Sequence, residues 1–323
     1  MHDVDANEQM LQAAHMYYVD NLTQAEIANV LGVSRPTVSR LLTRAREEGV
    51  VQIIISPWRQ RDSALEEVFC RKFNLRGAII VRSAGSADSA TMRQGIGFGA
   101  AAHVAKLFQQ NDVVGIGRGR TLAELTAAMR PPPLPMNLTI VQLLGDVSAQ
   151  HDETLAHELT RQLAVNFGGK AYYLSAPALV ENATVRNMLM NSVAIRTVSQ
   201  LYRAVRIALV GIGEIEHSPL VLGGLISEAE AHRMAEQGIV GDICGYFFDL
   251  DGRFRSTIFD DRTIGITLDE LRAREYVIAV AGGSDKVLPL LGVLRSGIVN
   301  FVVTDHVTAA QILAKADAAR HAP

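Results

Sequence analysis

The chain has 323 residues, which exceeds one small domain and suits a small module joined to a larger one. Its hydrophobic content of 48% with 6% aromatics is typical of an α/β protein with a sizeable core, and no apolar run approaches the roughly 18 residues of a membrane span. The formal net charge of −3 excludes a uniformly basic protein, so any contact with nucleic acid requires a local patch.

The first residues, Met1-His2-Asp3-Val4-Asp5, lack the basic and apolar regions of a signal peptide. Two well-separated cysteines, Cys70 and Cys244, do not make a disulfide framework and are expected to be buried small apolar residues. We therefore expect a cytoplasmic protein that does not contact a membrane.

The first fifty residues predict three helices. Apolar residues at helical spacing indicate a helix over Asn7 to Asp20. A capping box, Thr23 with Glu26, begins a second helix over Gln24 to Leu31, which stops at Gly32. Ser34 is a suitable N-cap for a third helix that runs to about Glu48 and buries Val38, Leu41, Leu42 and Ala45. Two short helices joined by a glycine turn have helix-turn-helix geometry.

The third helix presents arginines and hydroxyl side chains, with no acidic residue before Glu47. Arginine pairs with guanine edges or phosphates and hydroxyls pair with either, so this composition suits a helix in a DNA major groove. An arginine-rich solvated face is the alternative. Gly49 and the run Val50 to Ile55 predict the wing of a winged helix, which completes a DNA-binding domain over residues 1–60. Its candidate DNA contacts are Thr23, Gln24, Ser34, Arg35, Pro36, Thr37, Ser39, Arg40, Thr43 and Arg44.

A helix from about Asp62 to Phe73 follows the module. It is predicted either to pack on the larger domain, which we favour, or to pair with a partner subunit. Beyond it, strands and helices alternate, which predicts an α/β domain over residues 61–323 with a mostly parallel sheet covered on both faces. Predicted strands are Ala78–Val81, Asp112–Ile116, Leu138–Leu143, Ala171–Leu174, Ile207–Val210, Tyr246–Asp249, Tyr276–Ala281 and Phe301–Thr304.

Helices are predicted between these strands. They cover Ser89–Gln109, Thr121–Met129, Thr154–Asn166, Val185–Tyr202, Ser227–Glu236, Asp285–Ser296 and Thr308–Ala319. The glycines Gly95, Gly97 and Gly99 lie inside the first of them and are expected to permit close packing rather than to bind a nucleotide.

The stretch Val113 to Leu122 is typical of an anion site. A short apolar strand ends in the alternating glycines Gly115, Gly117 and Gly119, and Arg120 and Thr121 begin the next helix. Glycine lets a ligand approach the backbone, while unpaired N–H groups and the helix dipole favour negative charge. The pattern predicts a phosphate-binding turn, although a nucleotide enzyme would have the same pattern.

Three other segments are predicted to meet this turn at the carboxyl ends of the strands, where ligands of such sheets bind. They are Gln142 to Asp152, Phe248 to Gly252 and Ala281 to Lys286. The last two are also good tight turns. Lys286 lies in a first helical turn, where it opposes the dipole, and this favours a ligand. His151, His217 and His306 have no metal-ligand spacing, so we expect no metal site.

The residues taken together resemble the SorC family of bacterial transcriptional regulators, sometimes grouped with the DeoR-type sugar regulators, over essentially the full length. The segments that carry the resemblance are Leu22 to Ala28, Ser34 to Leu41, Val114 to Leu122, Ala208 to Gly213, Gly238 to Ile243, Phe247 to Gly252, Val280 to Lys286, and Val299 to Asp305 with Ala309 and Ala310. The resemblance implies a winged helix-turn-helix followed by a Rossmann-like domain similar to sugar-phosphate isomerases. It also implies a carbohydrate operon as the target, a phosphorylated sugar as effector and a homo-oligomer, a tetramer or a dimer.

Carried over by motif, the resemblance implies that the first glycine turn holds the phosphate and that Asp249 and Lys286 contact the sugar. Many relatives have Trp where this chain has Arg118, whose side chain either adds phosphate affinity or faces solvent. The candidate effector residues are Gly117, Arg118, Gly119, Arg120, Thr121, Gln142, Asp249, Gly282, Gly283 and Lys286. We expect operator DNA and the effector as partners, and neither cofactor nor catalysis. A regulator of unphosphorylated sugar or polyol and an active isomerase remain the alternatives.

Overall fold

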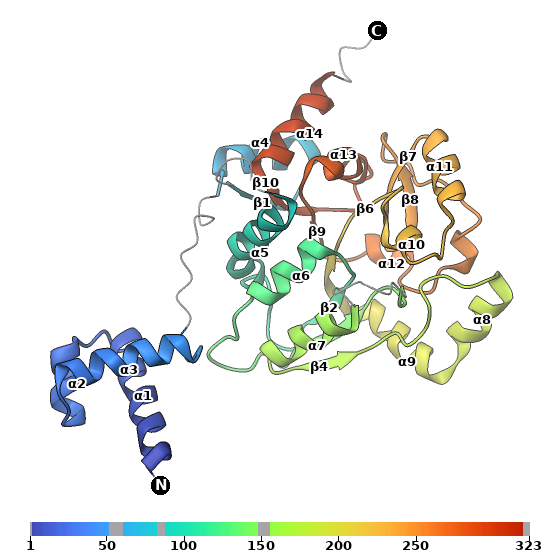
Figure 1. Cartoon of the computed structure of the whole chain (residues 1–323). Helices are drawn as coiled ribbons and strands as arrows, with labels where there is room; N and C mark the ends of the chain where they lie inside the picture. Colours follow the sequence, from blue (N-terminus) through green and yellow to red (C-terminus); the bar gives the residue numbers. More distant parts are fainter. Residues whose placement is uncertain (1, 52–60, 83–87, 148–155, 319–323) are drawn as a thin grey trace. The chain divides into compact units, whose positions relative to one another are not determined.

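The computed structural model describes residues 2–51, 61–82, 88–147 and 156–318 (Figure 1). The chain divides into two compact units, an N-terminal unit of residues 1–56 and a C-terminal unit of residues 57–323. Within the described ranges, no helix combines the length and the apolar character that a membrane crossing demands.

The described part of the N-terminal unit contains three helices, α1 (His2–Tyr18), α2 (Gln24–Leu31) and α3 (Arg35–Glu47). The capping box of Thr23 and Glu26 is confirmed, as are the left-handed Gly32 after α2 and the Ser34 N-cap of α3. A small core holds the helices together and includes Ala13, Ile27, Val38 and Leu42. The predicted wing falls mostly on residues 52–55, which lie outside the described residues.

A seven-stranded sheet forms the centre of the C-terminal unit, and all its strands run parallel. Its order is β1-β10-β9-β5-β2-β3-β4. The strands are β1 (Gly77–Val81), β2 (Val113–Ile116), β3 (Thr139–Gln142), β4 (Lys170–Tyr172), β5 (Val205–Val210), β9 (Tyr276–Val280) and β10 (Phe301–Asp305). The predicted mostly parallel sheet is therefore confirmed, and each of these strands lies within a few residues of a predicted one.

Helices cover both faces of this sheet (Figure 1). The helices in the described part of the C-terminal unit are α4 (Ser63–Phe73), α5 (Ser89–Ala105), α6 (Arg120–Ala128), α7 (Ala156–Asn166), α8 (Ala183–Asn191), α9 (Val193–Leu201), α10 (Pro219–Leu222), α11 (Glu228–Glu236), α12 (Leu268–Arg272), α13 (Val287–Arg295) and α14 (His306–Ala318). One core lies under α5, α6 and α7, and a second under α4, α9, α13 and α14. Strands buried on both faces explain the near-continuous apolar runs of the sequence.

The structure differs from the predicted helices in two respects and agrees with the favoured packing of a third helix. The helix expected over Val185–Tyr202 is two helices, α8 and α9, which meet at Ser192, the C-cap of one and the N-cap of the other. The short helices α10 and α12 were not expected, because four or five residues carry too little periodicity to detect. Helix α4 packs on β1 and α14 of its own chain, as favoured.

The largest correction concerns the strand predicted over Tyr246–Asp249. It is β8 (Tyr246–Asp249) of a separate antiparallel sheet, β6-β7-β8, together with β6 (Gly213–Glu214) and β7 (Ile239–Ile243). A two-residue turn at Cys244 and Gly245, both with positive φ, joins β7 to β8. Residues of α10 and α11 cover the small sheet and form a third core with it. Antiparallel pairing decides which residues of β7 and β8 reach the carboxyl edge of the large sheet.

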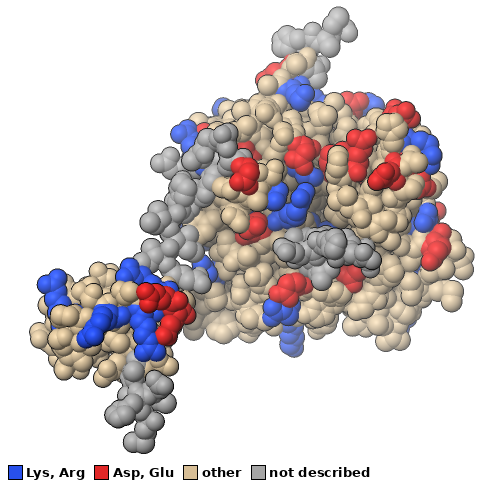
Figure 2. Space-filling model, viewed as in Figure 1, with Lys and Arg blue, Asp and Glu red and all other residues tan. Residues whose placement is uncertain are grey.

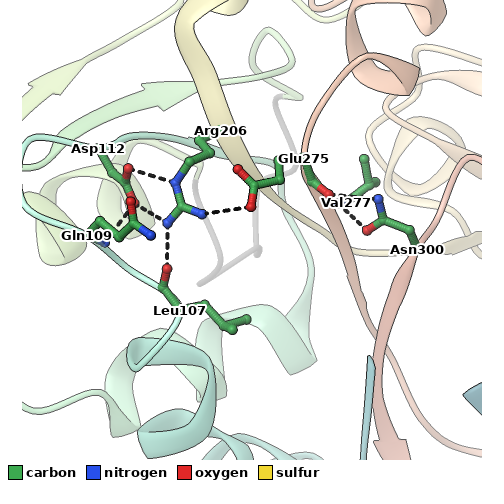
Figure 3. Close-up of polar contacts among 7 residues, drawn as sticks. All are labelled: Leu107, Gln109, Asp112, Arg206, Glu275, Val277 and Asn300. Carbon is green, nitrogen blue, oxygen red and sulfur yellow. Dashed lines mark hydrogen bonds and ion pairs between the residues drawn. The ribbon is translucent and has the colours of Figure 1, made fainter. Parts of the chain in front are cut away.

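A charged network closes the amino edge of the large sheet (Figure 3). The Arg206 guanidinium donates to both carboxylate oxygens of Asp112, at 2.8 and 2.5 Å, and to the Leu107 carbonyl at 2.5 Å. Glu275 lies 3.4 Å from the same guanidinium. These residues come from β5 and from the segments just before β2 and β9, so the network ties three neighbouring strands together where they begin.

Candidate functional site

A cavity of about 800 Å³ opens at the carboxyl edge of the large sheet. It lies where β2, β5 and β9 end, and α5, α6, α10 and the small antiparallel sheet contribute further walls. Sugar-sized ligands occupy cavities of this volume. The structure brings together seven of the ten predicted effector residues as cavity lining: Gly117, Arg118, Gly119, Arg120, Thr121, Gly282 and Lys286.

The first glycine turn has the geometry of an anion site. Gly119 is the N-cap of α6 with φ of +145°, a region open to glycine, and it provides no side-chain cap. The amides of Arg120 and Thr121 in the first turn of α6 therefore have no intrahelical acceptor. The Gly117 amide is different, because it donates to the Leu209 carbonyl of β5 at 2.8 Å and is therefore already hydrogen-bonded within the fold. The turn thus offers helix amides and the side chains of Arg118, Arg120 and Thr121.

A third glycine lets this turn lie close to β5. A Cβ atom at Gly211 would overlap the Arg118 carbonyl oxygen, far inside van der Waals contact. Gly211 also lines the cavity. Any larger residue there would displace the turn that holds Arg118 and Gly119.

The second glycine turn is fixed from behind by buried polar groups. The Gly283 amide donates to the Thr308 hydroxyl at 2.8 Å, and that hydroxyl donates to the buried carboxylate of Asp305. Gly282 lines the cavity, whereas Gly283 does not and instead holds the turn in place through its bond to Thr308. The Lys286 ammonium lies 3.6 Å from the Asp285 carboxylate, and both residues line the cavity. The turn therefore presents a cation on a rigid base.

Two predicted effector residues do not line the cavity and make hydrogen bonds within the fold. Asp249 accepts from the amides of Asp251 and Arg253, at 3.0 and 2.9 Å, and thereby closes the turn after β8. It pairs with Ile239 at the start of β7, so it lies at the end of the hairpin away from the cavity. Gln142 is fully buried and bonds to the Leu144 carbonyl and the Leu174 amide. Residues 148–152, also expected near the site, lie outside the described residues.

Asp242 is the carboxylate that the prediction missed. It sits near the end of β7, where the antiparallel hairpin reaches the cavity, and it is 8% exposed. Its Oδ2 accepts from the Gly245 amide at 3.2 Å, and Gly213 leaves room for its Oδ1. Burial raises the pKa of Asp242, against the opposing charges of Lys286 and Arg118. Only tertiary structure shows this placement, since the run Gly238 to Ile243 has no motif that marks a ligand.

The rest of the lining divides into cationic and apolar parts. Arg93 of α5 joins Arg118, Arg120 and Lys286, and basic side chains gather near the middle of the visible face of the C-terminal unit (Figure 2). The apolar part includes Leu144, Ile212 and Leu220. Burial raises the pKa of the Cys244 thiol to about 12, so this lining residue is neutral. The cavity therefore suits a molecule with one anionic end and a less polar or polyol body.

In the N-terminal unit, α3 exposes the predicted reading face. Arg35, Pro36, Ser39 and Arg40 are exposed, whereas Val38, Leu42 and Ala45 are buried beneath. Thr23 and Ser34 use their hydroxyls as helix caps. The remaining candidates on α3, Thr37, Thr43 and Arg44, and Gln24 of α2 are half-buried.

Arg44 differs from Arg40 in its contacts. The Arg44 guanidinium donates to Glu48 at 2.6 Å and to Asn7 of α1 at 2.7 Å, which fixes it to its own unit. Among the residues that the structure describes, Arg40 donates only to the Thr37 hydroxyl, at 3.4 Å, from an exposed position. Arg40 is therefore the better placed of the two for a base edge.

Family comparisons agree with this architecture. Residues 59–314 match the Sugar-bind family, which describes a sugar-binding domain, and residues 9–60 match a Crp-like helix-turn-helix domain. The chain is 33% identical to the deoxyribonucleoside regulator of Bacillus subtilis over 95% of this chain and 97% of that protein. It is 30% identical to the sorbitol operon regulator of Klebsiella pneumoniae over 97% of this chain and 100% of that protein.

A solved structure gives the same result. The full-length sorbitol operon regulator SorC from Klebsiella pneumoniae superposes with a TM-score of 0.78 at 30% identity, covering 94% of this chain and 97% of that one. A helix-turn-helix joined to a sugar-binding α/β domain defines the class of sugar-binding transcriptional regulators. Within that class, this chain belongs to the SorC family.

Proposed function

We propose that this regulator controls a carbohydrate catabolic operon and that a phosphorylated sugar or polyol in the cavity changes its affinity for operator DNA. The observation that carries the proposal is the uncapped start of α6, which faces one cavity together with Arg93, Arg118, Arg120 and Lys286. A phosphate group carries about −1.5 to −2 charges at neutral pH and accepts several hydrogen bonds, so it matches this end of the cavity.

The other end of the ligand is a hydroxylated carbon chain in this proposal. Asp242 offers carboxylate oxygens to hydroxyl donors, and Leu144, Ile212 and Leu220 pack against carbon atoms. Binding needs no cofactor. The two named relatives are a deoxyribonucleoside regulator and a sorbitol operon regulator, so sugar and polyol operons are the class of target that we propose.

We propose a sensor rather than an isomerase. Isomerisation requires a general base within hydrogen-bond reach of a carbon-bound proton, and the pair that the sequence suggests is Asp249 with Lys286. Asp249 caps a turn at the far end of its hairpin, and this position argues against that pair. Relatives named as transcriptional regulators support the same conclusion.

Regulation requires that the effector bind two arrangements of the protein with different affinity, since equal affinity shifts nothing. A hundredfold change in operator affinity corresponds to about 2.7 kcal/mol of coupling, at about 1.4 kcal/mol per tenfold. We propose that this coupling acts through a homo-oligomer, a dimer or tetramer, in which the packing of the C-terminal units sets the spacing of two α3 helices.

An operator-shift assay tests the proposal. The probe is DNA that flanks the gene itself, and matched pairs of sugars and sugar phosphates are added. We expect one phosphorylated member to change the shift and its unphosphorylated partner to leave it unchanged. Thr121→Ala with Lys286→Ala should retain DNA binding and lose the response, whereas Arg40→Ala should lose DNA binding and retain effector binding in a thermal-shift assay.

A response to the unphosphorylated sugar alone would replace the phosphate part of the proposal with a polyol sensor. No change in DNA binding with Arg40→Ala would show that another surface reads the operator. Turnover of a sugar phosphate by the protein would refute the sensor.

A further inference from the structure

Arg93 is a cavity residue to which neither the sequence motif nor the family comparison gives a role. It lies on α5, outside both glycine turns, and lines the cavity beside Ser89 and Met92 of the same helix. Asp88 caps the start of α5 and accepts from the amides of Ala90 and Thr91, at 2.9 and 3.0 Å. These first amides of α5 are thus already used, so the charge that α5 brings to the cavity is that of the Arg93 side chain.

A close contact between helices fixes where this guanidinium lies. A Cβ atom at Gly97 would stand 2.7 Å from the Leu125 amide nitrogen and closer still to the Glu124 carbonyl, so the backbones of α5 and α6 touch there. Arg93 is four residues before Gly97, and Arg120 is four residues before Glu124. One turn of helix separates each arginine from the contact, so the two side chains project toward the cavity from neighbouring helices.

The two guanidiniums repel one another across the cavity. Burial lowers the pKa of Arg93, and the nearby charge of Arg120 lowers it further. Within the described part of the chain, neither arginine forms an ion pair or a side-chain hydrogen bond, unlike Arg206 at the opposite edge of the sheet. The charges of three acids, Glu124, Asp285 and Asp88, act on Arg93 through space and raise its pKa, against the effects of burial and of Arg120.

We propose that Arg93 and Arg120 form one anion clamp across α5 and α6, which grips the phosphate of the effector from the side opposite the amides of α6. The inference rests on the proposed function and adds a specificity residue to it. Guanidinium pairs hold phosphate through paired N–H donors, which an ammonium does not reproduce. A dianion between them removes the repulsion, so the clamp gives a doubly charged phosphate an advantage over a singly charged or neutral group.

Titration with inorganic phosphate tests the clamp in the full-length protein. Calorimetry gives the dissociation constant, and thermal melting gives the stability with and without phosphate. The expected result for Arg93→Gln is binding weakened at least tenfold, the equivalent of about 1.4 kcal/mol, because a hydrogen bond to a charged group is lost. Without phosphate, its melting temperature should equal or exceed that of the wild type, because one repulsive charge is gone.

Three further variants sharpen the result. Arg93→Lys keeps the charge and should bind more weakly than the wild type but more tightly than Arg93→Gln. The double variant of Arg93→Gln and Arg120→Gln should lose less affinity than the product of the two single losses, since the residues act together. Arg233→Gln, an exposed arginine on α11, is the matched control and should bind as the wild type does.

Two results would overturn the clamp. Unchanged phosphate affinity in Arg93→Gln, with normal binding by the wild type, removes the clamp and leaves the proposed function standing. A wild-type protein that does not bind phosphate removes the clamp and the phosphorylated effector together. The operator-shift assay then decides between a polyol sensor and no sensor.

Discussion

The two edges of the large sheet differ in whether their charged side chains are paired. At the amino edge, Arg206 pairs with the buried Asp112 through two hydrogen bonds and with Glu275, so opposite charges neutralise one another (Figure 3). At the carboxyl edge, Arg93 and Arg120 face one cavity without an ion pair within the described residues, and Asp242 is buried with a raised pKa. The paired charges of the first edge stabilise the fold, whereas the cations of the second edge are the groups that we propose bind a ligand.

Backbone geometry separates the edges as well. The carboxyl edge depends on glycines such as Gly119, Gly211 and Gly282, where a side chain would meet backbone or neighbouring side chains, or where φ is positive. Its amides and cations converge because the backbone comes close there. The proposed anion site is therefore built from groups that the fold does not use for its own stability.

Arg206→Met should cause the largest loss in the free energy of unfolding. It leaves Asp112, 8% exposed, with a buried carboxylate and no guanidinium, and losing one partner of a buried ion pair costs about 3–5 kcal/mol. Urea unfolding measures the loss. Arg272→Met, which removes an exposed pair with Asp269, is the control and should cost less than about 1 kcal/mol. Equal losses in the two variants would show that the amino-edge network is not special.

Gly97→Ala should have the next largest effect. Its methyl group meets the Glu124 backbone and forces α5 from α6, which costs about 1–3 kcal/mol and exceeds the roughly 1 kcal/mol that alanine gains in a helix. Phosphate binding should weaken too, because Arg93 and Arg120 separate. Gln94→Ala, exposed on the same helix, should alter neither quantity. A Gly97→Ala protein that is more stable than the wild type would contradict the close contact.

Asp242→Asn should have the smallest effect on unfolding, and of opposite sign. The pKa of Asp242 is raised in the folded protein, so between the ordinary pKa of an aspartate and the folded value the unfolded chain binds fewer protons. Wild-type stability therefore falls as pH rises through that window, and the variant lacks this fall. Its advantage over the wild type should grow from about pH 4 upward, by at most about 1.4 kcal/mol for each pH unit, and then level off.

Unfolding measured at several pH values checks this sign. The Asn side chain can still accept from the Gly245 amide, so the fold is retained. A variant that is less stable than the wild type at pH 7 would mean that Lys286 and Arg118 outweigh the burial of the carboxylate. Asp242→Asn should also bind more weakly to whichever sugar phosphate the operator-shift assay identifies, because the carboxylate proposed to accept from the ligand hydroxyls is lost.

The sequence determined what depends on local physics. Capping residues and a glycine turn set the ends of α2 and α3, and apolar runs set the strands of the parallel sheet. The alternating glycines before Arg120 and Thr121 identified one wall of the cavity, because a strand, a glycine turn and a helix start are contiguous in the chain. Each of these features can be predicted from neighbouring residues alone, without knowing which distant residues contact them.

Tertiary structure alone decided which distant residues share the cavity. The sequence of β8 is typical of a strand, but nothing in it shows that the strand pairs antiparallel with β7. This pairing places Asp242 in the cavity lining and Asp249 at the other end of the hairpin. Arg93 resembles any helical arginine until Gly97 places α5 against α6. Pairing direction and helix contact depend on residues far apart in the chain, so local periodicity carries no information about them.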